Sequence, residues 1–205
     1  IRLYDTPKAP YEKIGYARPV VLDDNGAWEA ILENAYDIIV TGEINGEDTL
    51  TFSIPFRDSK RKYLENEKKI QIVDDVYKVR TITDVKDSTG NTVTQIYAEA
   101  EFYDLTFSVR KEEKKFDAET ADVAMAYALA DTEWSVGTVN VTSKRTWTST
   151  EKNALSILRS VANLHGGDLV FDCPNRLVHL LTVNGKDSGA LFAYKKNMKS
   201  IERVV

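Results

Sequence analysis

The stretch NEKKIQIVDDVYKVRTITDVKDSTGNTVTQIYAEAEFYDLTF, residues 66–107, decides the fold. Apolar and polar residues alternate along it from Ile70 to Thr81, apart from an acidic break at residues 74–75. A second break at residues 86–91 carries turn-forming residues and is followed by another alternating run. Three alternating runs separated by two breaks predict an antiparallel β-meander.

The last run of this meander has two distinct faces. One face is mainly apolar and the other is polar or aromatic: Ile96, Ala98, Ala100 and Phe102 against Tyr97, Glu99, Glu101 and Tyr103. A slip of one residue would turn the whole apolar set toward water, so the pattern fixes the strand register. We therefore expect one buried face and one at least partly solvated face.

The chain before the meander reads as a series of short strands and turns. Strands are expected at residues 2–5, 19–22, 37–44 and 50–55, and turns at residues 23–26 and at Asn45-Gly46. Residues 6–19 carry three prolines and are expected to be irregular. Residues 27–35 have only a weak assignment. Together with the meander, this gives five to seven antiparallel strands before residue 108. That number is enough to close as a small barrel or a two-layer sandwich.

The composition changes after Phe107, where residues 110–115 form a charged crossing without an apolar member. Asp117 is then expected to cap a helix, with Glu119 in its first turn and an end near Asp131. The apolar face expected for this helix is Val123, Ala124, Tyr127 and Ala128. A strand is expected at residues 134–142, and residues 144–147 are expected to extend it or pair with it.

A second helix is predicted by a capping box, Thr148 with Glu151, and by an apolar stripe that stops at Gly166-Gly167. The stripe consists of Ala154, Leu155, Leu158, Val161 and Ala162. Strands are expected at residues 169–173, 177–183 and 190–194, with the helices packed on one face of an open sheet. A final strand within residues 196–205 has no partner in this unit, which suggests that the chain returns to the first unit.

These assignments give an α+β fold that is mainly β. The domains expected are a β-barrel at residues 1–109, an inserted α+β domain at residues 110–195 and a returning strand at residues 196–205. Because residue 1 is Ile and residues 201–205 stop without a turn, we expect the chain to be an N-terminal fragment of a longer polypeptide.

The charge balance argues against a surface that grips phosphates. The chain has 27 basic and 32 acidic residues, for a net charge of −5. Its two basic runs, Arg57 to Lys62 and Lys111 to Lys115, are interleaved with acids and are expected to be solvated faces. There is no run of 18 apolar residues and no charged-then-apolar leader, so we expect no membrane insertion by this chain.

No motif in the sequence carries recognisable chemistry. The single cysteine, Cys173, excludes an intrachain disulfide and reads as a small buried hydrophobe. His165 at a helix end and His179 within a strand belong to no HExxH or HxH pattern, and capping and sheet-surface roles are expected for them. The acid pairs Asp23-Asp24, Asp74-Asp75 and Glu112-Glu113 are expected in turns or in the charged crossing. We therefore predict no catalytic, cofactor-binding or metal-binding residue, and no enzymatic activity.

Several segments, in their order and spacing, resemble one known family. These segments are Asn34-Ala35, Val40 to Ile44, Asn45-Gly46, Leu50 to Pro55, the IQIVDDVYKV unit at residues 70–79, AEAEFYDL at residues 98–105, residues 155–168 and YKKNMKSI at residues 194–201. They are similar to the N-terminal region of phage minor structural tail proteins, the tail-associated lysin or prophage endopeptidase tail family. The resemblance covers nearly the whole chain.

The resemblance implies a baseplate or tail-tip hub in the virion, with three copies in a ring at the distal end of the tail tube. The first domain would be a tail-tube-like β-barrel that continues the channel, and the α+β domain would buttress it from outside. The implied partners are further copies of this chain in a homotrimer, the distal tail protein and the tape measure protein, with DNA passing through the ring without specific binding. Peptidoglycan-cleaving or fibre domains of the family lie downstream of this region.

Two other functions stay open from the residues alone. One is a cell-wall (peptidoglycan) hydrolase domain of a tail-associated lysin, which requires converging carboxylates or a histidine-centred site. The other is a carbohydrate-binding module that uses exposed aromatics among Trp28, Trp134 and Trp147. Aromatics at alternating strand positions more often belong to the core.

Overall fold

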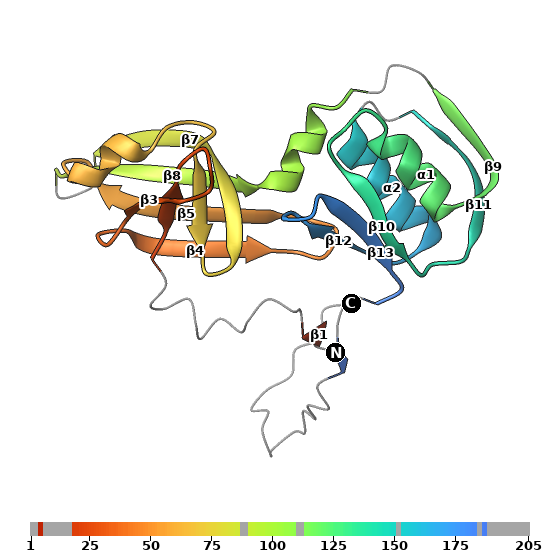
Figure 1. The fold of residues 1–205 in the computed structure, drawn as a ribbon. Helices are drawn as coiled ribbons and strands as arrows, with labels where there is room; N and C mark the ends of the chain where they lie inside the picture. The colour runs from red at the N-terminus through yellow and green to blue at the C-terminus, as the bar shows by residue number, and fades with distance from the viewer. Residues whose placement is uncertain are drawn as a thin grey trace, which may run out of the picture.

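The structure is a computed structural model that describes residues 4–5, 18–86, 90–109, 113–150, 153–183 and 186–187, the first and last of these ranges by backbone alone. Figure 1 shows two units side by side, joined by a short helical segment. The strands are β1 Tyr4–Asp5, β2 Val20–Leu22, β3 Trp28–Ile31, β4 Tyr36–Gly42, β5 Asp48–Pro55, β6 Lys69–Ile72, β7 Asp75–Lys86, β8 Thr92–Ala100, β9 Lys114–Thr120, β10 Ser135–Val139, β11 Lys144–Ser149, β12 Asp168–Asp172, β13 Leu177–Leu181 and β14 Lys186–Asp187. The helices are α1 Ala121–Leu129 and α2 Ala154–His165, with the 3-10 segments η2 Ser59–Tyr63 and η3 Glu101–Thr106.

The first unit is one antiparallel sheet of seven strands in the order β3-β2-β6-β7-β8-β5-β4. The sheet curls into a half-barrel around its apolar residues. Its two edge strands, β3 and β4, follow each other in the chain. A short corner, in which Leu32 and Ala35 are buried, carries the backbone from one edge of the sheet to the other. The predicted α+β, mainly β fold class is confirmed.

The predicted meander is β6-β7-β8, and its alternation sets the buried face as expected. Ile96, Ala98 and Ala100 of β8 are buried. The alternation was expected to continue to Phe102, and this was wrong. The chain leaves the sheet after Ala100 and enters η3, where Glu101 and Phe102 are both buried. A 3-10 helix has three residues per turn, whereas side chains in a strand alternate with a period of two, so the alternation is lost in η3.

The predicted hairpin at Asn45-Gly46 connects β4 to β5. Asn45 adopts a left-handed φ of 59°, and the Gly46 N–H donates to Glu43 O at 3.1 Å. Before the turn, β4 contains a bulge, because the register shifts between Tyr36 and Ile39 and Asp37 has a φ of 51°. The weakly assigned stretch 27–35 forms β3 and the buried corner.

In the second unit the helices lie between two small sheets. One sheet has the order β10-β13-β12, and the other pairs β11 with β9 (Figure 1). Phe116 of β9 is buried against the Trp147 ring of β11 at 4.8 Å and the Tyr127 ring of α1 at 5.7 Å, measured between centroids. The expectation of helices on one face of one sheet is therefore wrong, because the β9-β11 ribbon covers the other side of the helices.

The predicted start of the first helix is wrong. Residues 114–120 form β9, and the carboxylate of Asp117 accepts a hydrogen bond from the Thr146 hydroxyl of β11 at 3.1 Å. α1 begins four residues later, after Thr120, with no side-chain cap. Its buried residues are Ala121, Ala124, Met125, Ala128 and Leu129, whereas Val123 is exposed. Pairing of β9 with β11 outweighs the capping preference of a lone aspartate.

The second helix has the predicted stripe and a different cap. All five stripe residues are buried, and α2 ends at Gly166, whose φ is 80°. Its N-cap is Asn153, whose side-chain oxygen accepts the Ser156 N–H at 2.8 Å. Thr148 instead lies in β11, so the predicted capping box is wrong, and Glu151 lies outside the described residues.

The remaining strands differ from prediction in their pairing. β10 pairs in parallel with β13, and β11 pairs with β9 instead of extending β10. β12 and β13 form the predicted antiparallel pair. β1 pairs antiparallel with β14. The strands predicted at residues 190–194 and 196–205 lie outside the described residues.

Candidate functional site

The two units meet at the β4–β5 turn, where the side chain of Asn45 replaces a strand partner. Its amide nitrogen donates to Gly167 O at 3.1 Å, and its amide oxygen accepts the Leu169 N–H at 2.6 Å. The carboxamide presents an N–H and a C=O side by side, as one residue of a neighbouring strand does, so it satisfies two backbone groups at the start of β12. A Cβ atom at Gly167 would lie 2.7 Å from Leu181 O of β13, so the close packing of this turn on β13 requires glycine.

Stacked aromatic rings continue this junction. Phe102 of η3 is 5% exposed and stacks on Phe171 of β12 with ring centroids 4.0 Å apart. Trp134 meets the same Phe171 ring edge-on at 6.1 Å. Aromatic pairs in these geometries contribute about 0.5–1.5 kcal/mol each beyond their buried area.

Polar contacts surround the stacked rings. Arg159 of α2 donates to Gly46 O at 2.9 Å, and the Arg176 guanidinium lies 3.7 Å from Glu101 and 5.3 Å from the Trp134 ring centroid. The Ala154 N–H donates to Ser108 O at 3.1 Å. Buried apolar residues of the two units belong to one continuous cluster. The two units are therefore held together by a packed interface as well as by the segment of chain that links them.

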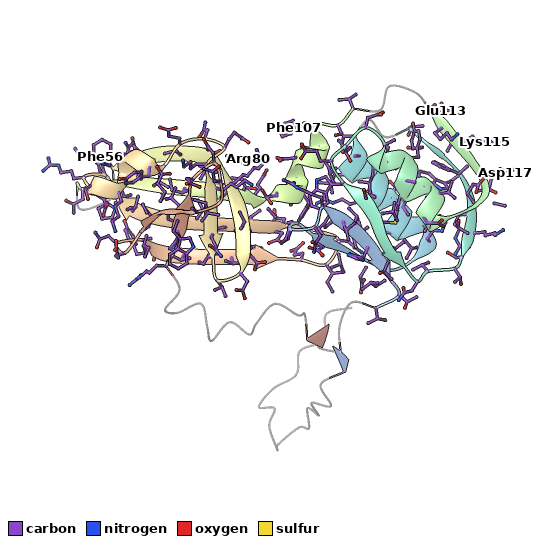
Figure 2. All side chains as sticks on the ribbon, viewed as in Figure 1. Phe56, Arg80, Phe107, Glu113, Lys115 and Asp117 are labelled. Atoms are coloured by element: carbon purple, nitrogen blue, oxygen red, sulfur yellow. The ribbon has the colours of Figure 1, made fainter. Side chains whose placement is uncertain are left out.

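A network of charges fastens η3 to the sheet around Arg80 of β7. Its guanidinium donates to both oxygens of Glu67, at 2.7 and 2.6 Å, to Asp104 at 2.6 Å and to Glu99 at 3.2 Å. Figure 2 shows Arg80 and Phe107 near each other, and the Phe107 centroid lies 5.7 Å from the guanidinium carbon. Glu67 lies in the loop before β6, Glu99 in β8 and Asp104 in η3, so one arginine ties three segments of backbone together.

Ionisation in this network follows from its geometry. Burial alone would lower the pKa of Arg80, but its hydrogen bonds to Asp104 and Glu67 outweigh burial and raise that pKa. Burial opposes ionisation of Asp104, yet hydrogen bonds from Lys78 and Arg80 hold its pKa below the usual value. Burial and a hydrogen bond to Glu99 raise the pKa of Tyr97 to about 12. Arg80 and Asp104 are therefore a charged pair at neutral pH.

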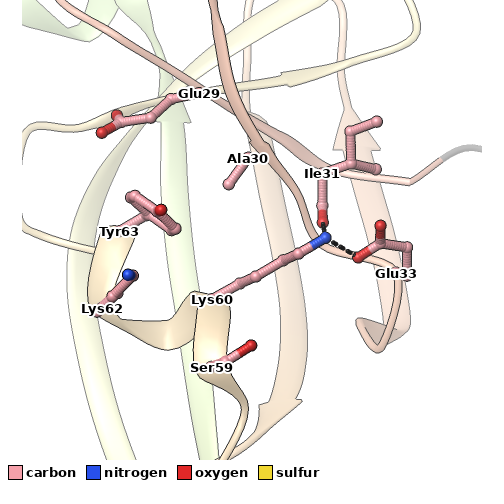
Figure 3. Close-up of a pocket in the computed structure, with 8 residues that line it drawn as sticks. All are labelled: Glu29, Ala30, Ile31, Glu33, Ser59, Lys60, Lys62 and Tyr63. Atoms are coloured by element: carbon pink, nitrogen blue, oxygen red, sulfur yellow. Dashed lines mark hydrogen bonds and ion pairs between the residues drawn. The ribbon is translucent and has the colours of Figure 1, made fainter.

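A shallow pocket lies at the β3 edge of the first unit. It has a volume of about 390 Å³ and is lined by Glu29, Ala30, Ile31, Glu33, Ser59, Lys60, Lys62 and Tyr63. Figure 3 shows Lys60 reaching across it to Ile31 O, at 2.7 Å, and to the Glu33 carboxylate. This ion pair lowers the pKa of Glu33. The lysine ties η2 to the corner after β3, so its amine serves the fold.

Both histidines have structural partners. His165 is buried at the end of α2, with Nδ1 3.0 Å from Ser143 O and 3.3 Å from the Ser143 hydroxyl. His179 of β13 accepts the Thr138 N–H at Nδ1, 2.8 Å away, and so bridges to β10. His165 lies at the predicted helix end, with its ring on Ser143, and His179 lies in the predicted strand.

Cys173 packs against the core and is partly buried. Burial, together with the nearby Glu101 charge, raises the pKa of its thiol to about 11. At neutral pH the group is a thiol, and a thiol is a poor nucleophile. The position matches the predicted small hydrophobe.

The acid pairs and tryptophans are dispersed over the molecule. Asp23 accepts the backbone N–H groups of Asn25 and Ala27 in its own turn, at 2.9 and 2.8 Å. Asp75 begins β7, and Glu112 lies outside the described residues. Trp134 is buried, Trp147 packs on the core, and Trp28 is 68% exposed with its ring N–H donated to Gln71 at 3.0 Å. The three tryptophans do not share one surface.

Within the described ranges, no group of three or more His, Cys, Asp or Glu side chains is placed to hold a metal ion. Over the same ranges, no helix is long and apolar enough to cross a membrane. The residues that join the two units, Asn45, Phe102 and Phe171, were predicted only as turn or core residues. Their contacts lie more than 60 residues apart in the chain, and the local pattern carries no signal for them.

The fold and the junction define a two-unit, mainly β protein, and comparisons with known sequences identify its family. The model of the prophage endopeptidase tail N-terminal domain matches residues 19–100, and the model of the prophage endopeptidase tail domain matches residues 108–180. The two matches follow each other and correspond to the two units. The chain belongs to the prophage endopeptidase tail family, as the resemblance in its sequence predicted. A structural role in a phage or prophage tail follows from this membership.

Solved structures of tail proteins share the fold. The prophage tail protein gp18 of Listeria monocytogenes has a TM-score of 0.70 at 15% identity, over 89% of this chain and 56% of that one. A tail protein of Neisseria meningitidis has a TM-score of 0.54 at 13% identity, over 80% of this chain and 50% of its own. A 43 kDa tail protein of prophage MuSo2 from Shewanella oneidensis has a TM-score of 0.54 at 13% identity, over 82% and 56%. The chain thus spans about half the length of these relatives. A search of curated proteins gives no match.

Proposed function

We propose that this chain is a hub subunit at the distal tip of a siphophage or prophage tail. Three copies form a ring that closes or continues the tail tube and carries downstream domains that contact or penetrate the host wall. The neighbours of the ring are the distal tail protein and the tape measure protein, and the ring assembles in the cytoplasm of the bacterial host. The first unit, residues 1–109, forms the wall, and the inserted unit, residues 110–195, supports it.

The observation that carries this proposal is the interface between the two units. Asn45 satisfies backbone groups of the second unit, and Phe102 stacks on Phe171 across the boundary. A part that transmits load in an assembly benefits from one fixed orientation of its units. The consecutive family matches and the shared fold with three tail proteins support the same role.

The electrostatics of the sheet support passage of DNA without specific binding. On the face of β6 and β7 opposite the core, the cations are all paired with acids: Lys69 with Glu101 at 2.8 Å, Lys78 with Asp104, and Arg80 with Glu67, Glu99 and Asp104. Each cation free to neutralise a phosphate would add salt-dependent affinity for DNA. These ion pairs and the net charge of −5 keep that affinity low.

We further propose that this chain performs no catalysis, and that any peptidoglycan cleavage belongs to a domain downstream. The groups that could act as bases, such as His179 and Asp23, are engaged by backbone N–H groups. Incubation of the chain with purified peptidoglycan is expected to release no soluble muropeptides. Release of muropeptides by the chain would contradict this part of the proposal.

The assembly state tests the central claim. Light scattering over a range of protein concentrations should give the mass of a trimer, and negative-stain images should show a threefold ring with a central hole. A monodisperse monomer at the highest concentration, both alone and with the distal tail protein added, would overturn the hub assignment. DNA retention on the assembled ring at physiological salt should equal that of an uncharged control surface.

A further inference from the structure

The turn between β4 and β5 contains a residue pair, Asn45-Gly46, whose two members can react with each other. The glycine has no side chain, so its backbone nitrogen can approach the carboxamide of the preceding asparagine. Asparagine is one of the thermolabile residues of proteins. The sequence has Asn-Gly pairs at residues 25–26, 45–46 and 184–185, and the last pair lies outside the described residues.

The reaction open to such a pair is deamidation. The Gly46 nitrogen, after losing its proton to solvent, attacks Cγ of Asn45. A new C–N bond forms, the bond from Cγ to Nδ2 breaks, and the amide leaves as ammonia after taking a proton from solvent. Water then opens the cyclic imide at one of its carbonyl groups, which gives aspartate or isoaspartate. The reaction consumes only water.

The geometry of the turn retains both members of this pair. Asn45 has a φ of 59°, which lies in the left-handed region that glycine and asparagine adopt most readily. A Cβ atom at residue 46 would lie 2.8 Å from Cβ of Glu43, which is closer than side chains can pack. The reactive pair is therefore a consequence of the tight turn.

Both reacting groups are occupied in the folded protein. The Asn45 carboxamide is held at both ends, by Gly167 O at 3.1 Å and by the Leu169 N–H at 2.6 Å. The attacking nitrogen of Gly46 donates its N–H to Glu43 O at 3.1 Å. In Figure 1 the turn lies beside β12, where Leu169 belongs. The carboxamide is therefore released only when the two units separate at this turn.

The turn between β2 and β3 provides a comparison within the same chain. Its pair Asn25-Gly26 has the same backbone contact, because the Gly26 N–H donates to Asp23 O at 3.0 Å. Asn25 is exposed, whereas Asn45 is half-buried against the second unit. The rates of the two pairs, each taken relative to its rate in the unfolded chain, therefore measure the restraint that the second unit places on Asn45.

Deamidation of Asn45 removes the donor that binds the second unit. A carboxylate accepts hydrogen bonds and donates none, so the product turns a negative charge toward Gly167 O, which is also an acceptor. An isoaspartate also lengthens the backbone of the turn by a methylene group. In either product the original contact between the turn and Gly167 cannot form again.

We propose that Asn45-Gly46 is a deamidation site that the junction protects, and that its modification makes opening of the junction permanent. The two units separate and close reversibly while residue 45 is asparagine. They stay uncoupled once this residue is aspartate or isoaspartate. The inference concerns a single chain, so it does not depend on the ring proposed above.

Mass spectrometry of the aged protein tests the protection. The full chain is warmed at mildly alkaline pH, in buffer and in urea, and peptides that contain residues 25 and 45 are followed for loss of the amide. In urea the two sites should react at similar rates. In the folded chain Asn45 should react at least about tenfold more slowly than Asn25, since its reaction requires local opening. Equal rates in the folded chain would overturn the proposal.

A change distant from the turn tests the dependence on the junction. Phe102→Ala removes the ring stacked on Phe171 and should speed deamidation of Asn45 but not of Asn25. Phe107→Ala, at an exposed position after η3, is the matched control and should change neither rate. If Phe102→Ala does not fold, Arg159→Ala replaces it, because Arg159 donates to Gly46 O at 2.9 Å. An unchanged Asn45 rate in the folded junction variant would contradict the proposal.

Asn45→Asp reproduces one product directly. It should separate the unfolding transitions of the two units, followed by far-UV circular dichroism and by tryptophan fluorescence with Trp28 replaced by Phe. Asn25→Asp adds the same charge in an exposed turn and should leave the transitions coincident. Coincident transitions in Asn45→Asp would refute the permanent opening. A monomer in light scattering that shows both protection and uncoupling would exclude the hub and leave this inference standing.

Discussion

The two units bury their apolar residues in opposite ways. The first unit wraps one sheet around its core and leaves strand edges at β3 and β4, whereas the second unit places α1 and α2 between two small sheets and covers the helices on both sides. The second unit keeps strand edges too, in β9, β10, β11 and β12, but it divides its strands between two small sheets, whereas the first unit is a single sheet of seven strands. The first unit therefore depends on strand pairing around one core, whereas the second depends on helices packed between two sheets.

The contacts between the two units determine whether the units unfold together or one after the other. If Phe102 and Asn45 join the units as tightly as their geometry indicates, the two units should unfold together. With Trp28 of the first unit replaced by Phe, the fluorescence of Trp134 and Trp147 reports on the second unit, while far-UV circular dichroism reports on both units. Coincident transitions from the two probes are expected for the unaltered protein.

The largest effect is expected from Phe102→Ala. Removing this buried ring leaves a cavity against Phe171 and should lower the free energy of unfolding by about 3–5 kcal/mol. Urea unfolding followed by both probes measures the loss and should show the two transitions separating. Phe107→Ala, at a position 73% exposed just after η3, is the matched control and should cost less than about 1 kcal/mol. Equal losses for the two variants would show that the stacked rings do not couple the units.

A smaller effect is expected from Asn45→Ala. The change leaves Gly167 O and the Leu169 N–H without their partner, which should cost about 1–3 kcal/mol. Hydrogen exchange should also become faster at the Leu169 amide. Asn25→Ala, in an exposed turn of the first unit, serves as the control and should stay within about 0.5 kcal/mol. Unchanged protection of Leu169 in Asn45→Ala would contradict the role of the amide.

The second unit has a test of its own that separates two candidate caps. Asn153→Ala should destabilise α2 by about 0.5–2 kcal/mol, since it removes the acceptor of the Ser156 N–H. Thr148→Ala, at the cap position that the sequence predicts, lies exposed in β11 and should cost less than about 0.5 kcal/mol. Thermal unfolding followed by tryptophan fluorescence measures both changes. A larger loss for Thr148→Ala would place the start of α2 earlier than residue 154.

The smallest effect concerns pH and the first unit. Because folding lowers the pKa of Asp104, the folded state binds this proton less tightly than the unfolded state does. The stability that Asp104 contributes is complete above its unfolded pKa of about 3.9 and is lost as the pH falls through the lowered value. Asp104→Asn should therefore destabilise the protein at pH 7, by less than about 1 kcal/mol, and flatten the dependence of stability on pH below about 4. If the free energy of unfolding depended on pH in the same way in Asp104→Asn and in the parent protein, Asp104 would not be a source of that dependence.

The sequence predicted the first unit better than the second, and the reason is physical. A period of two is a local property, so residues 70–100 showed their strands and the buried face without any knowledge of partners. Helix caps are harder to predict from sequence, because the polar residues that cap helices also occur at exposed positions of strands. Asp117 and Thr148 were predicted to begin helices, yet both lie in the β9-β11 ribbon, where they face water. The junction was not predicted, because Asn45 and Leu169 have no local signal that relates them.

The β4–β5 turn has a further consequence for how such proteins diverge. Since Asn45 and Gly46 hold the second unit from a hairpin tip, an insertion or deletion in this turn would tilt that unit while both interiors keep their packing. Shape could then change in one evolutionary step, without the cost of redesigning a core. The length of this turn therefore sets the angle between the two units.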